Sequence, residues 1–227
     1  MFDVEEDVLL LSNSMATQFG EAAGNGCPYH HDQKEKINPN NMMPEYSQEQ
    51  DPTQTVKLPK QRQMSSIPKA KDADGPGSQS EDKNWFYPSP QQFYHALKKK
   101  DMAAPEENIE EMVDIHNFLN EGVWNEIMKW ESEYKDVCPS PSLLKFQGKA
   151  SNPTFKSRWT SLIYNQQTFD RHDWTIDRCG RQVRYIIDYY EQEENGQPTF
   201  YCDVRPAFDS PQAIFQRMRR AMQSFKQ

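Results

Sequence analysis

The spacing of apolar residues changes twice along the chain. Between residues 90 and 134, apolar positions recur every three or four residues, which predicts two amphipathic helices. Over residues 173–206 apolar and polar side chains alternate, which predicts antiparallel strands. Helical spacing returns after residue 210. Together these elements predict an α+β fold in which helices cover one face of a small antiparallel β-meander.

Helix-start signals place the first two helices. Ser89 and Gln92 occupy N-cap and capping-box positions around Pro90. The apolar face that follows consists of Phe93, Tyr94 and Leu97. A second start lies at Pro105, with two glutamates in the first turn, and we expect this longer helix to end near Tyr134.

One histidine interrupts the apolar stripe of the longer helix. The stripe begins with Ile109, Met112 and Val113. Its next position is His116. An imidazole there is either hydrogen-bonded within the core or serves as a ligand or catalyst, and the pattern alone favours the core. We also expect the helix to kink or divide at Asn120 and Gly122, because glycine costs about 1 kcal/mol relative to alanine in a helix interior.

Alternation predicts three strands and one further helix. Two strands run through residues 173–190 around an Arg-Cys-Gly turn, and a third covers residues 199–206 after an Asn195–Gly196 turn signal. Prolines and a glycine within residues 136–170 predict an irregular connection with at most short elements. The last helix opens at Ser210. Its apolar stripe consists of Ile214, Phe215, Met218, Met222 and Phe225.

Aromatic residues divide the chain into two parts. Only four of the 27 aromatic residues precede residue 84, and all five tryptophans follow it. Residues 1–83 are rich in Gln, Asn, Ser, Pro and acidic residues, a composition that cannot offset chain entropy by burial. We therefore predict a disordered N-terminal tail over residues 1–83 and one folded domain over residues 84–227.

The charge distribution excludes some partners. The net charge of −8 belongs mainly to the predicted tail, and no basic stripe suited to nucleic acid is present, so we expect no nucleic-acid partner. The basic residues near the C-terminal end complement a helix dipole or contact anionic lipid headgroups. They are Arg217, Arg219, Arg220 and Lys226. Without a long apolar run or a recognisable cleavable signal, we expect a soluble or membrane-peripheral chain.

Cysteine and motif patterns narrow the chemistry. The four cysteines form no CxxC pair, so we expect free thiols. They are Cys27, Cys138, Cys179 and Cys202. CxxCH, P-loop, Rossmann, GxSxG and HExxH motifs are absent, which excludes a covalent c-type cytochrome and disfavours ordinary hydrolases and NTPases.

Two further histidine-containing segments leave alternatives open. CPYHH, residues 27–31, offers a thiol and two imidazoles for transient contact with a metal or haem iron, or is simply part of an unstructured tail. His172 lies in DRHDW, where Asp170 and Asp173 either pair with Arg171 or orient the imidazole. A satisfied turn network is favoured there.

Four stretches together resemble the cytochrome c-type haem lyases, also called holocytochrome c synthases, in order and over nearly all of residues 84–227. They are YPSPQQFYHAL, IHNFLNEGVWNEIMKWE, FDRHDWTIDRCGRQVRYIIDYY and DVRPAFDS. The resemblance implies a lyase that joins the vinyl groups of haem b to the CxxCH cysteines of apocytochrome c, apocytochrome c1 or both. It also implies the mitochondrial intermembrane space and peripheral association with the inner membrane. A noncatalytic haem-binding or haem-transfer protein is the alternative, and a structural interaction domain is a third.

The resemblance also implies site residues. The histidine of the family's IHN motif is an axial haem ligand and falls on His116, which becomes the expected catalytic and iron-binding residue. Haem is a largely apolar disc with anionic propionates, so its site needs aromatic walls and a cationic edge. The expected walls, for which a plain aromatic core is the alternative, are Tyr87, Trp85, Phe93, Trp124 and Trp130. One or two propionate partners are expected among Arg171, Arg178, Arg184 and Arg205. Cys27, in a single Cys-Pro motif followed by Tyr29 where the family has a small apolar residue, is a candidate for transient haem contact.

Overall fold

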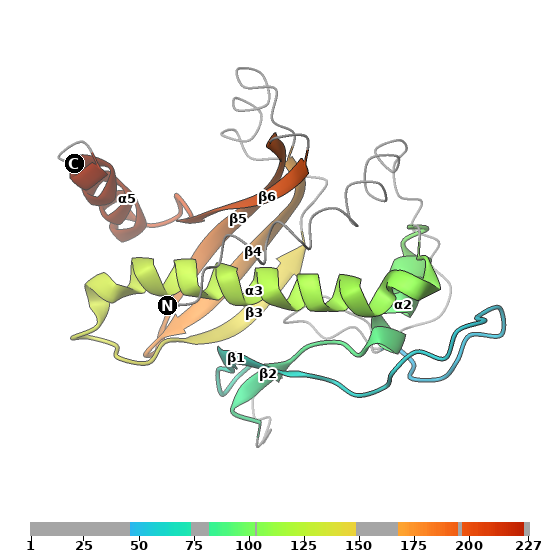
Figure 1. Ribbon diagram of the computed structural model, residues 1–227. Coiled ribbons are helices and arrows are strands. Elements are labelled where there is room, and N and C mark those ends of the chain that lie inside the picture. The colour runs from blue at the N-terminus through green and yellow to red at the C-terminus, as the bar shows by residue number, and fades with distance from the viewer. Residues whose placement is uncertain (1–45, 74–81, 103, 149–167, 195–196, 225–227) are drawn as a thin grey trace, which may run out of the picture.

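A four-stranded antiparallel sheet and one long helix form the centre of the molecule (Figure 1). The computed structural model describes residues 46–73, 82–102, 104–148, 168–194 and 197–224. The sheet has the order β3 (Ser142–Gly148), β4 (Thr168–Arg178), β5 (Arg181–Glu194) and β6 (Gln197–Pro206). Helix α3 (Ile109–Glu131) lies across one face of this sheet (Figure 1). The predicted α+β class is confirmed.

Smaller elements extend this core at both ends. Helix α2 (Pro90–Lys99) packs near the start of α3, and α5 (Pro211–Ser224) follows β6. Short 3-10 helices, η1 (Glu106–Asn108) and η2 (Ser132–Tyr134), flank α3. β1 (Met64–Pro68) and β2 (Asn84–Phe86) pair as a separate antiparallel ribbon beside α3. Within the described residues, no helix combines the length and apolarity needed to cross a membrane.

The sheet's register decides which side chains face α3. Trp174 pairs with Tyr185, and Ile187 pairs with Val204, so these four side chains share one face. All are buried against the helix in one apolar cluster. Trp130 of α3 donates its indole N–H to the carbonyl of Val204 at 2.8 Å. The core therefore lies between α3 and this face.

The local helix signals are confirmed, with one exception. Ser89 Oγ accepts from the backbone N–H of Gln92, and Gln92 Oε1 accepts from Ser89 N–H, both at 3.2 Å, as the capping box predicts. The expected division of the longer helix at Asn120 and Gly122 is wrong, because α3 continues without a break. Val123 and Ile127, which follow the glycine within the next two turns and are buried, offset its intrinsic cost by packing on the sheet.

A fourth strand lies where the sequence predicted an irregular connection. β3 pairs with β4, with Phe146 opposite Trp174. Leu143 is almost fully buried, and Phe146 packs against the same core, so burial favours an edge strand despite the prolines that precede it. Residues 149–167 of the predicted connection and the Asn195–Gly196 turn signal lie outside the described residues.

The expectation of free thiols is wrong for two cysteines. Cys138 and Cys179 form a disulfide, with their Cα atoms 5.6 Å apart. Cys179 and Gly180 both have positive φ, 50° and 92°, between the paired residues Arg178 and Arg181. This is the signature of a two-residue type I′ hairpin turn. The turn brings Cys179 to the loop after α3, a long-range contact that the cysteine spacing did not reveal. Cys202 remains a free thiol.

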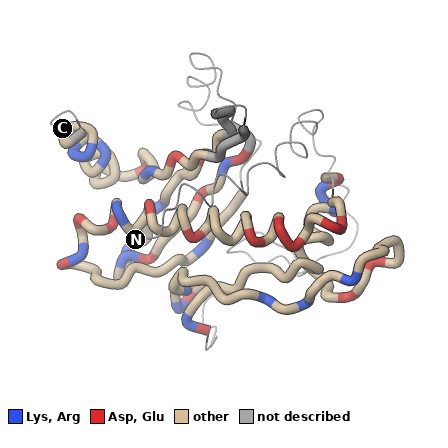
Figure 2. The backbone as a smooth tube through the Cα atoms, viewed as in Figure 1, with Lys and Arg blue, Asp and Glu red and all other residues tan. Residues whose placement is uncertain are grey.

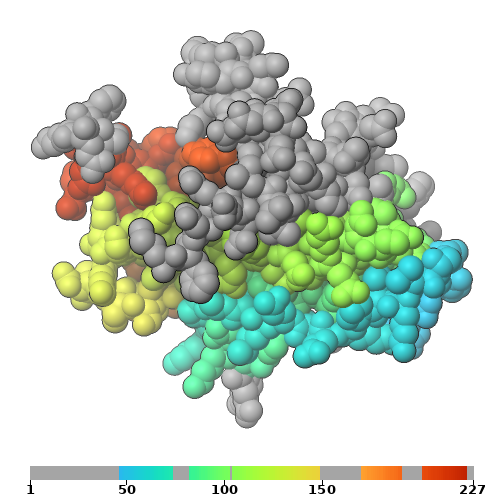
Figure 3. All heavy atoms as spheres, in the orientation of Figure 1, coloured from blue at the N-terminus to red at the C-terminus, as the bar shows by residue number. Residues whose placement is uncertain are grey.

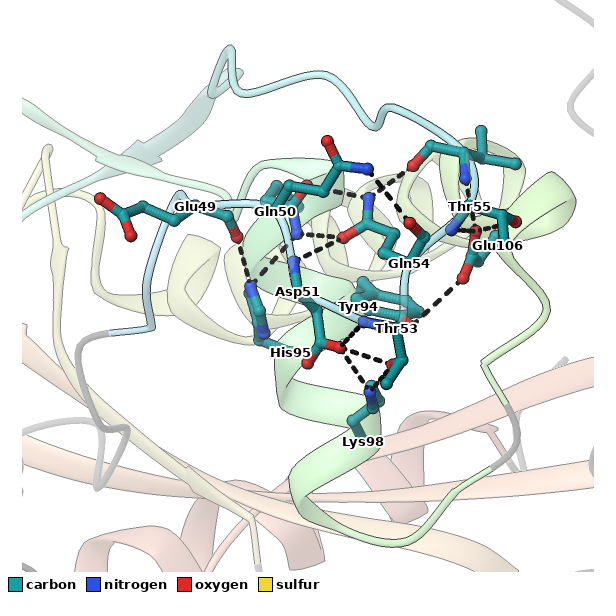
Figure 4. Close-up of polar contacts among 12 residues, drawn as sticks. Glu49, Gln50, Asp51, Thr53, Gln54, Thr55, Tyr94, His95, Lys98 and Glu106 are labelled. Carbon is teal, nitrogen blue, oxygen red and sulfur yellow. Dashed lines mark hydrogen bonds and ion pairs between the residues drawn. The ribbon is translucent and has the colours of Figure 1, made fainter.

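The boundary between tail and domain is also wrong at residue 83. Residues 46–73 are part of the fold, and Leu58 and Ile67 are each only 2% exposed. The Glu106 carboxylate accepts hydrogen bonds from the backbone N–H groups of Thr55 (2.7 Å) and Val56 (2.6 Å). Figure 4 shows these contacts, together with others that fasten the segment to α2. A few buried apolar side chains, together with backbone N–H groups that are hydrogen-bonded to a side chain of the domain, order a segment whose composition is polar. Residues 1–45 and 74–81 of the predicted tail lie outside the described residues.

Candidate functional site

His116 lies in the first half of α3, half-buried and held by neighbouring amides. Its Nδ1 is 3.2 Å from Asn117 Oδ1, and Asn117 Nδ2 donates to Gln63 Oε1 at 2.9 Å. The second contact fixes which end of the Asn117 amide faces the imidazole. Asn117 Oδ1 is therefore the acceptor, and the histidine proton lies on Nδ1.

The other ring nitrogen of His116 keeps its lone pair. Asn120 Nδ2 lies 3.2 Å from His116 Nε2 and also donates to the His116 carbonyl at 2.7 Å. With the proton on Nδ1, Nε2 accepts from this amide. A neutral imidazole that is oriented through Nδ1 and keeps the Nε2 lone pair for an acceptor role is the usual arrangement for a histidine that binds a metal ion.

Burial keeps this imidazole neutral. It lowers the pKa of His116 from 6.5 to about 4, the hydrogen bond with Asn117 opposes the shift, and the charges of His172 and Lys100 add to it. At neutral pH the lone pair of His116 is thus not occupied by a proton. Iron coordination requires this protonation state.

Two aromatic rings border His116. The ring of Tyr87 meets the imidazole edge-on with centroids 6.0 Å apart, and the ring of Phe93 lies at 5.6 Å. The Tyr87 hydroxyl donates to Glu121 Oε1 at 2.8 Å, and the same oxygen accepts from the backbone N–H of Ser66 at 2.9 Å. The residue that follows β2, helix α2 and helix α3 therefore converge on the imidazole, and of the five predicted wall residues Tyr87 and Phe93 lie beside it.

The second histidine is one that the sequence assigned to a turn network. His172 instead lies within β4, where its Nε2 is 3.0 Å from Asp170 Oδ2 and its ring contacts Tyr189 at 5.4 Å between centroids. The charges of His172 and of its partner Asp170 both act on His116, and each shifts the pKa of that imidazole. The available signal was the alternation of Asp170, His172 and Trp174, which puts all three on the core face of one strand.

The predicted tryptophan walls lie in the core. Trp124 belongs to the apolar cluster between α3 and the sheet, as does Trp130. Trp85 stacks edge-on against Phe146 at 5.3 Å and donates its indole N–H to the carbonyl of Leu143 at 3.1 Å. Among the described contacts none of these tryptophans touches His116. The alternative of a plain aromatic core therefore accounts for their placement.

Three of the four predicted propionate partners lie on the sheet face opposite α3. Arg171 alternates with His172 along β4, and the register puts Arg184 and Arg205 on the same face as Arg171. Arg184 bridges Asp173 and Asp209, at 2.8 Å each. A cavity of about 530 Å³ on this face is lined in part by Arg184, and His116 is not among its lining residues. The structure does not bring these arginines to the imidazole.

Arg178 faces α3 but is already paired. Its guanidinium makes two hydrogen bonds to the Glu131 carboxylate, at 2.5 and 2.6 Å, and both side chains are almost fully buried. Tyr185 donates its hydroxyl to the same carboxylate. Glu131 lies about four helical turns, roughly 22 Å, beyond His116 along α3. Cys27, the remaining predicted contact, lies outside the described residues.

The chain matches known proteins over most of its length. The family model described as cytochrome c/c1 heme lyase matches residues 12–221. The holocytochrome-c synthase of Saccharomyces cerevisiae is 39% identical over 220 residues, 86% of this chain and 79% of that protein. The holocytochrome c-type synthase of Homo sapiens is 40% identical over 196 residues, 83% and 70% of the two chains. A putative holocytochrome-c1 synthase of Schizosaccharomyces pombe is 40% identical over 151 residues, 66% and 68%. No solved structure matches.

These comparisons define the class of the protein as a lyase whose substrate is haem. The chain belongs to the cytochrome c/c1 haem lyase family. The resemblance inferred from the four sequence stretches is thereby confirmed.

Proposed function

We propose that this chain attaches haem b covalently to apocytochrome c, apocytochrome c1 or both, with His116 as the axial iron ligand. The observation that supports this most is the state of the imidazole: neutral, oriented by Asn117 and bordered by Tyr87 and Phe93. An apolar setting with one nitrogen ligand is what a porphyrin requires.

In the proposed reaction, haem binds through its iron to His116 Nε2, which releases its contact with the Asn120 amide. The imidazole of the apocytochrome CxxCH then takes the other face of the iron, which brings both thiols to the vinyl groups. Each S–H adds across a vinyl double bond, forming one C–S and one C–H bond, so no external oxidant is consumed. Catalysis consists mainly of holding the partners in this geometry.

The reaction needs no nucleophile from the lyase itself. Among the described cysteines Cys202 is the free thiol, and burial raises its pKa to about 12, with the charge of Glu126 adding to the shift. It is therefore protonated and unreactive at neutral pH. Both attacking sulfurs belong to the apocytochrome in this scheme.

For the propionates, the charges that act on His116 add a candidate. Lys100, at the C-cap of α2, is exposed, and its charge acts on both His116 and Asp170. We propose Lys100 as one propionate partner. A role for the four arginines remains a prediction, in which haem retention falls on single Arg→Ala replacement, and unchanged retention at all four would remove it.

From the family to which the chain belongs, we propose that it works in the mitochondrial intermembrane space, peripherally bound to the inner membrane. Cys27 is proposed as a transient haem contact during loading. Both proposals rest on the family resemblance, and side-by-side reactions with apocytochrome c and c1 would establish the substrate.

The axial assignment is tested by replacing His116 with Ala. Protein, haem, reductant and an apocytochrome are mixed, and the product is extracted with acid-acetone. Covalent haem that resists extraction is expected from the parent protein, together with an iron–imidazole spectrum of the haem-loaded lyase. His116→Ala should lose both, because it removes the imidazole proposed as the iron ligand. His95→Ala, which removes a half-buried imidazole from α2, is the matched control and should retain both.

Two outcomes would contradict the proposal in different ways. Complete extraction of haem from the parent reaction would leave only a haem-binding or haem-transfer protein. An unchanged spectrum in His116→Ala would show that the iron takes its ligand elsewhere.

A further inference from the structure

The final helix is amphipathic in the opposite sense from the rest of the fold. Ile214, Met218 and Met222 recur at intervals of four along α5, with Phe215 beside them, so they form one stripe. These four side chains are 39–61% exposed. Phe208, just before the helix, is 64% exposed and extends the stripe. We call these five residues the α5 apolar face.

The opposite side of α5 attaches it to the domain. Ala213 and Gln216 are buried, and Gln216 Nε2 donates to the carbonyl of Trp130 at 2.8 Å. The Arg220 guanidinium stacks over the Trp130 ring at 4.1 Å. Polar and small residues thus face the protein, and the α5 apolar face points away from it. Figures 1 and 3 show α5 at the periphery, beyond the end of α3.

An apolar face of this size is uncommon on a soluble monomer, where exposed apolar residues are usually scattered. Within the described residues, the exposed large apolar side chains elsewhere are Met64, Phe118, Val137 and Tyr201, and they lie on other elements. On the helix the α5 apolar face runs along about two and a half turns, from Ile214 to Met222. Such a face marks an interaction surface.

Charge indicates which occupant fits. α5 contains three arginines and no acidic residue, although the chain as a whole has a net charge of −8. Figure 2 shows this helix as blue segments without red. Arg219 and Arg217 lie on the two borders of the apolar face. Arg219 is 53% exposed with Glu133 at 3.9 Å, and Arg217 stacks over Phe208 at 3.7 Å.

We propose that α5 is the membrane contact of this protein and that it lies in the interface of a bilayer containing anionic lipids. The apolar face enters the boundary between headgroups and acyl chains, and the bordering arginines meet lipid phosphates. Because Arg217 and Arg219 border the apolar face of a helix without acidic residues, the protein binds such a surface through α5 in a single orientation. The proposal deepens the peripheral location given above and does not depend on haem chemistry.

Flotation with lipid vesicles tests this proposal. The chain of 227 residues is mixed with phosphatidylcholine vesicles, with or without about a fifth of phosphatidylglycerol. We expect binding to the anionic vesicles, weakened by salt. Met218→Glu should reduce the bound fraction at least about tenfold, because a charge replaces an inserted apolar group. Arg219→Gln should weaken binding to anionic vesicles and leave residual binding to neutral ones unchanged.

Met64→Glu is the matched control. Met64 is 61% exposed and Met218 is 59% exposed, but Met64 lies on β1, so the same chemical change there should leave binding intact. Thermal unfolding of each variant verifies folding. Equal vesicle binding by Met218→Glu and the parent would overturn the proposal. So would a parent dimer that Met218→Glu converts to monomer without any loss of lipid binding, since a second copy would then occupy the face.

Haem attachment in solution separates this inference from the proposed function. Met218→Glu that leaves vesicles but still attaches haem supports α5 as the membrane contact. Loss of apocytochrome binding in Met218→Glu with unchanged flotation would assign the face to the apocytochrome and contradict the proposal. Failure of the parent to attach haem would contradict the proposed function and leave the vesicle result standing.

Discussion

At the residue scale, the chemistry of His116 follows from its neighbours. Asn117 comes next in the sequence and fixes the proton on Nδ1, and Asn120, one turn later, holds Nε2. Gln63, from a segment before β1, fixes the Asn117 amide in turn. Orientation of a metal-binding histidine by such partners commonly changes affinity by about 10–100-fold. Two of the asparagines on the amphipathic helix α3 therefore orient this imidazole.

Burial of His116 makes stability depend on pH. The folded-state pKa of about 4 lies below the unfolded value of 6.5, so between these values the unfolded chain binds more protons. The contribution of the neutral imidazole to the free energy of unfolding is fully present above pH 6.5 and is lost as the pH falls toward 4. From pH 7 to 5, the parent should lose at most about 2 kcal/mol more than His116→Gln. Urea unfolding of both proteins at the two pH values measures this difference, and equal losses would contradict a buried neutral imidazole.

At the element scale, α3 is fixed to the sheet by polar contacts at its C-terminal end and by apolar packing along its length. The buried Arg178–Glu131 pair joins β4 to α3, and Tyr185 of β5 shares the carboxylate. The Cys138–Cys179 disulfide ties the loop after α3 to the same hairpin. These contacts fix the C-terminal end of α3 relative to the sheet. Because α3 is continuous, they also fix where His116 lies relative to the sheet.

Breaking the buried pair should be costly. Arg178→Ala leaves a carboxylate without its partner in the core, and we expect a loss of about 3–5 kcal/mol in unfolding free energy. Glu126→Ala removes the exposed pair with Lys129 on the same helix and should cost under about 1 kcal/mol. Denaturant unfolding of the two variants makes the comparison. Equal effects would show that the buried pair does not fix α3.

At the scale of the whole molecule, the domain is larger than its aromatic content suggests. Residues 46–73 run beside α2 and α3 in a continuous surface (Figure 3). They supply Leu58 to one apolar cluster and Ile67 to the other. The segment also supplies Gln63 to the His116 site. The polar region before β2 thus helps to build both the core and the site.

Leu58→Ala tests whether this segment stabilises the domain. Leu58 packs with residues of α2 and α3, so the replacement should cost about 2–5 kcal/mol through lost burial and the cavity left behind. Its exposed neighbour Lys57, replaced by Ala, should change stability by less than about 0.5 kcal/mol. Thermal unfolding provides the measurement. A variant as stable as the parent would return the segment to the predicted tail.

The sequence by itself determined the helices, the strands after residue 168, the family and the iron-ligand candidate. Capping residues and apolar periods act within a few turns. The sequence alone therefore reveals the cap at Ser89, the alternation before Arg178 and the place of His116 on its apolar stripe. Only the tertiary structure decided what meets across the core. Pairing of distant strands brought His172 toward His116, turned Arg171 to the other face and joined Cys138 to Cys179. The same packing left the α5 apolar face outside, because attachment through Trp130 oriented that helix, and the apolar stripe alone does not say on which side its partner lies.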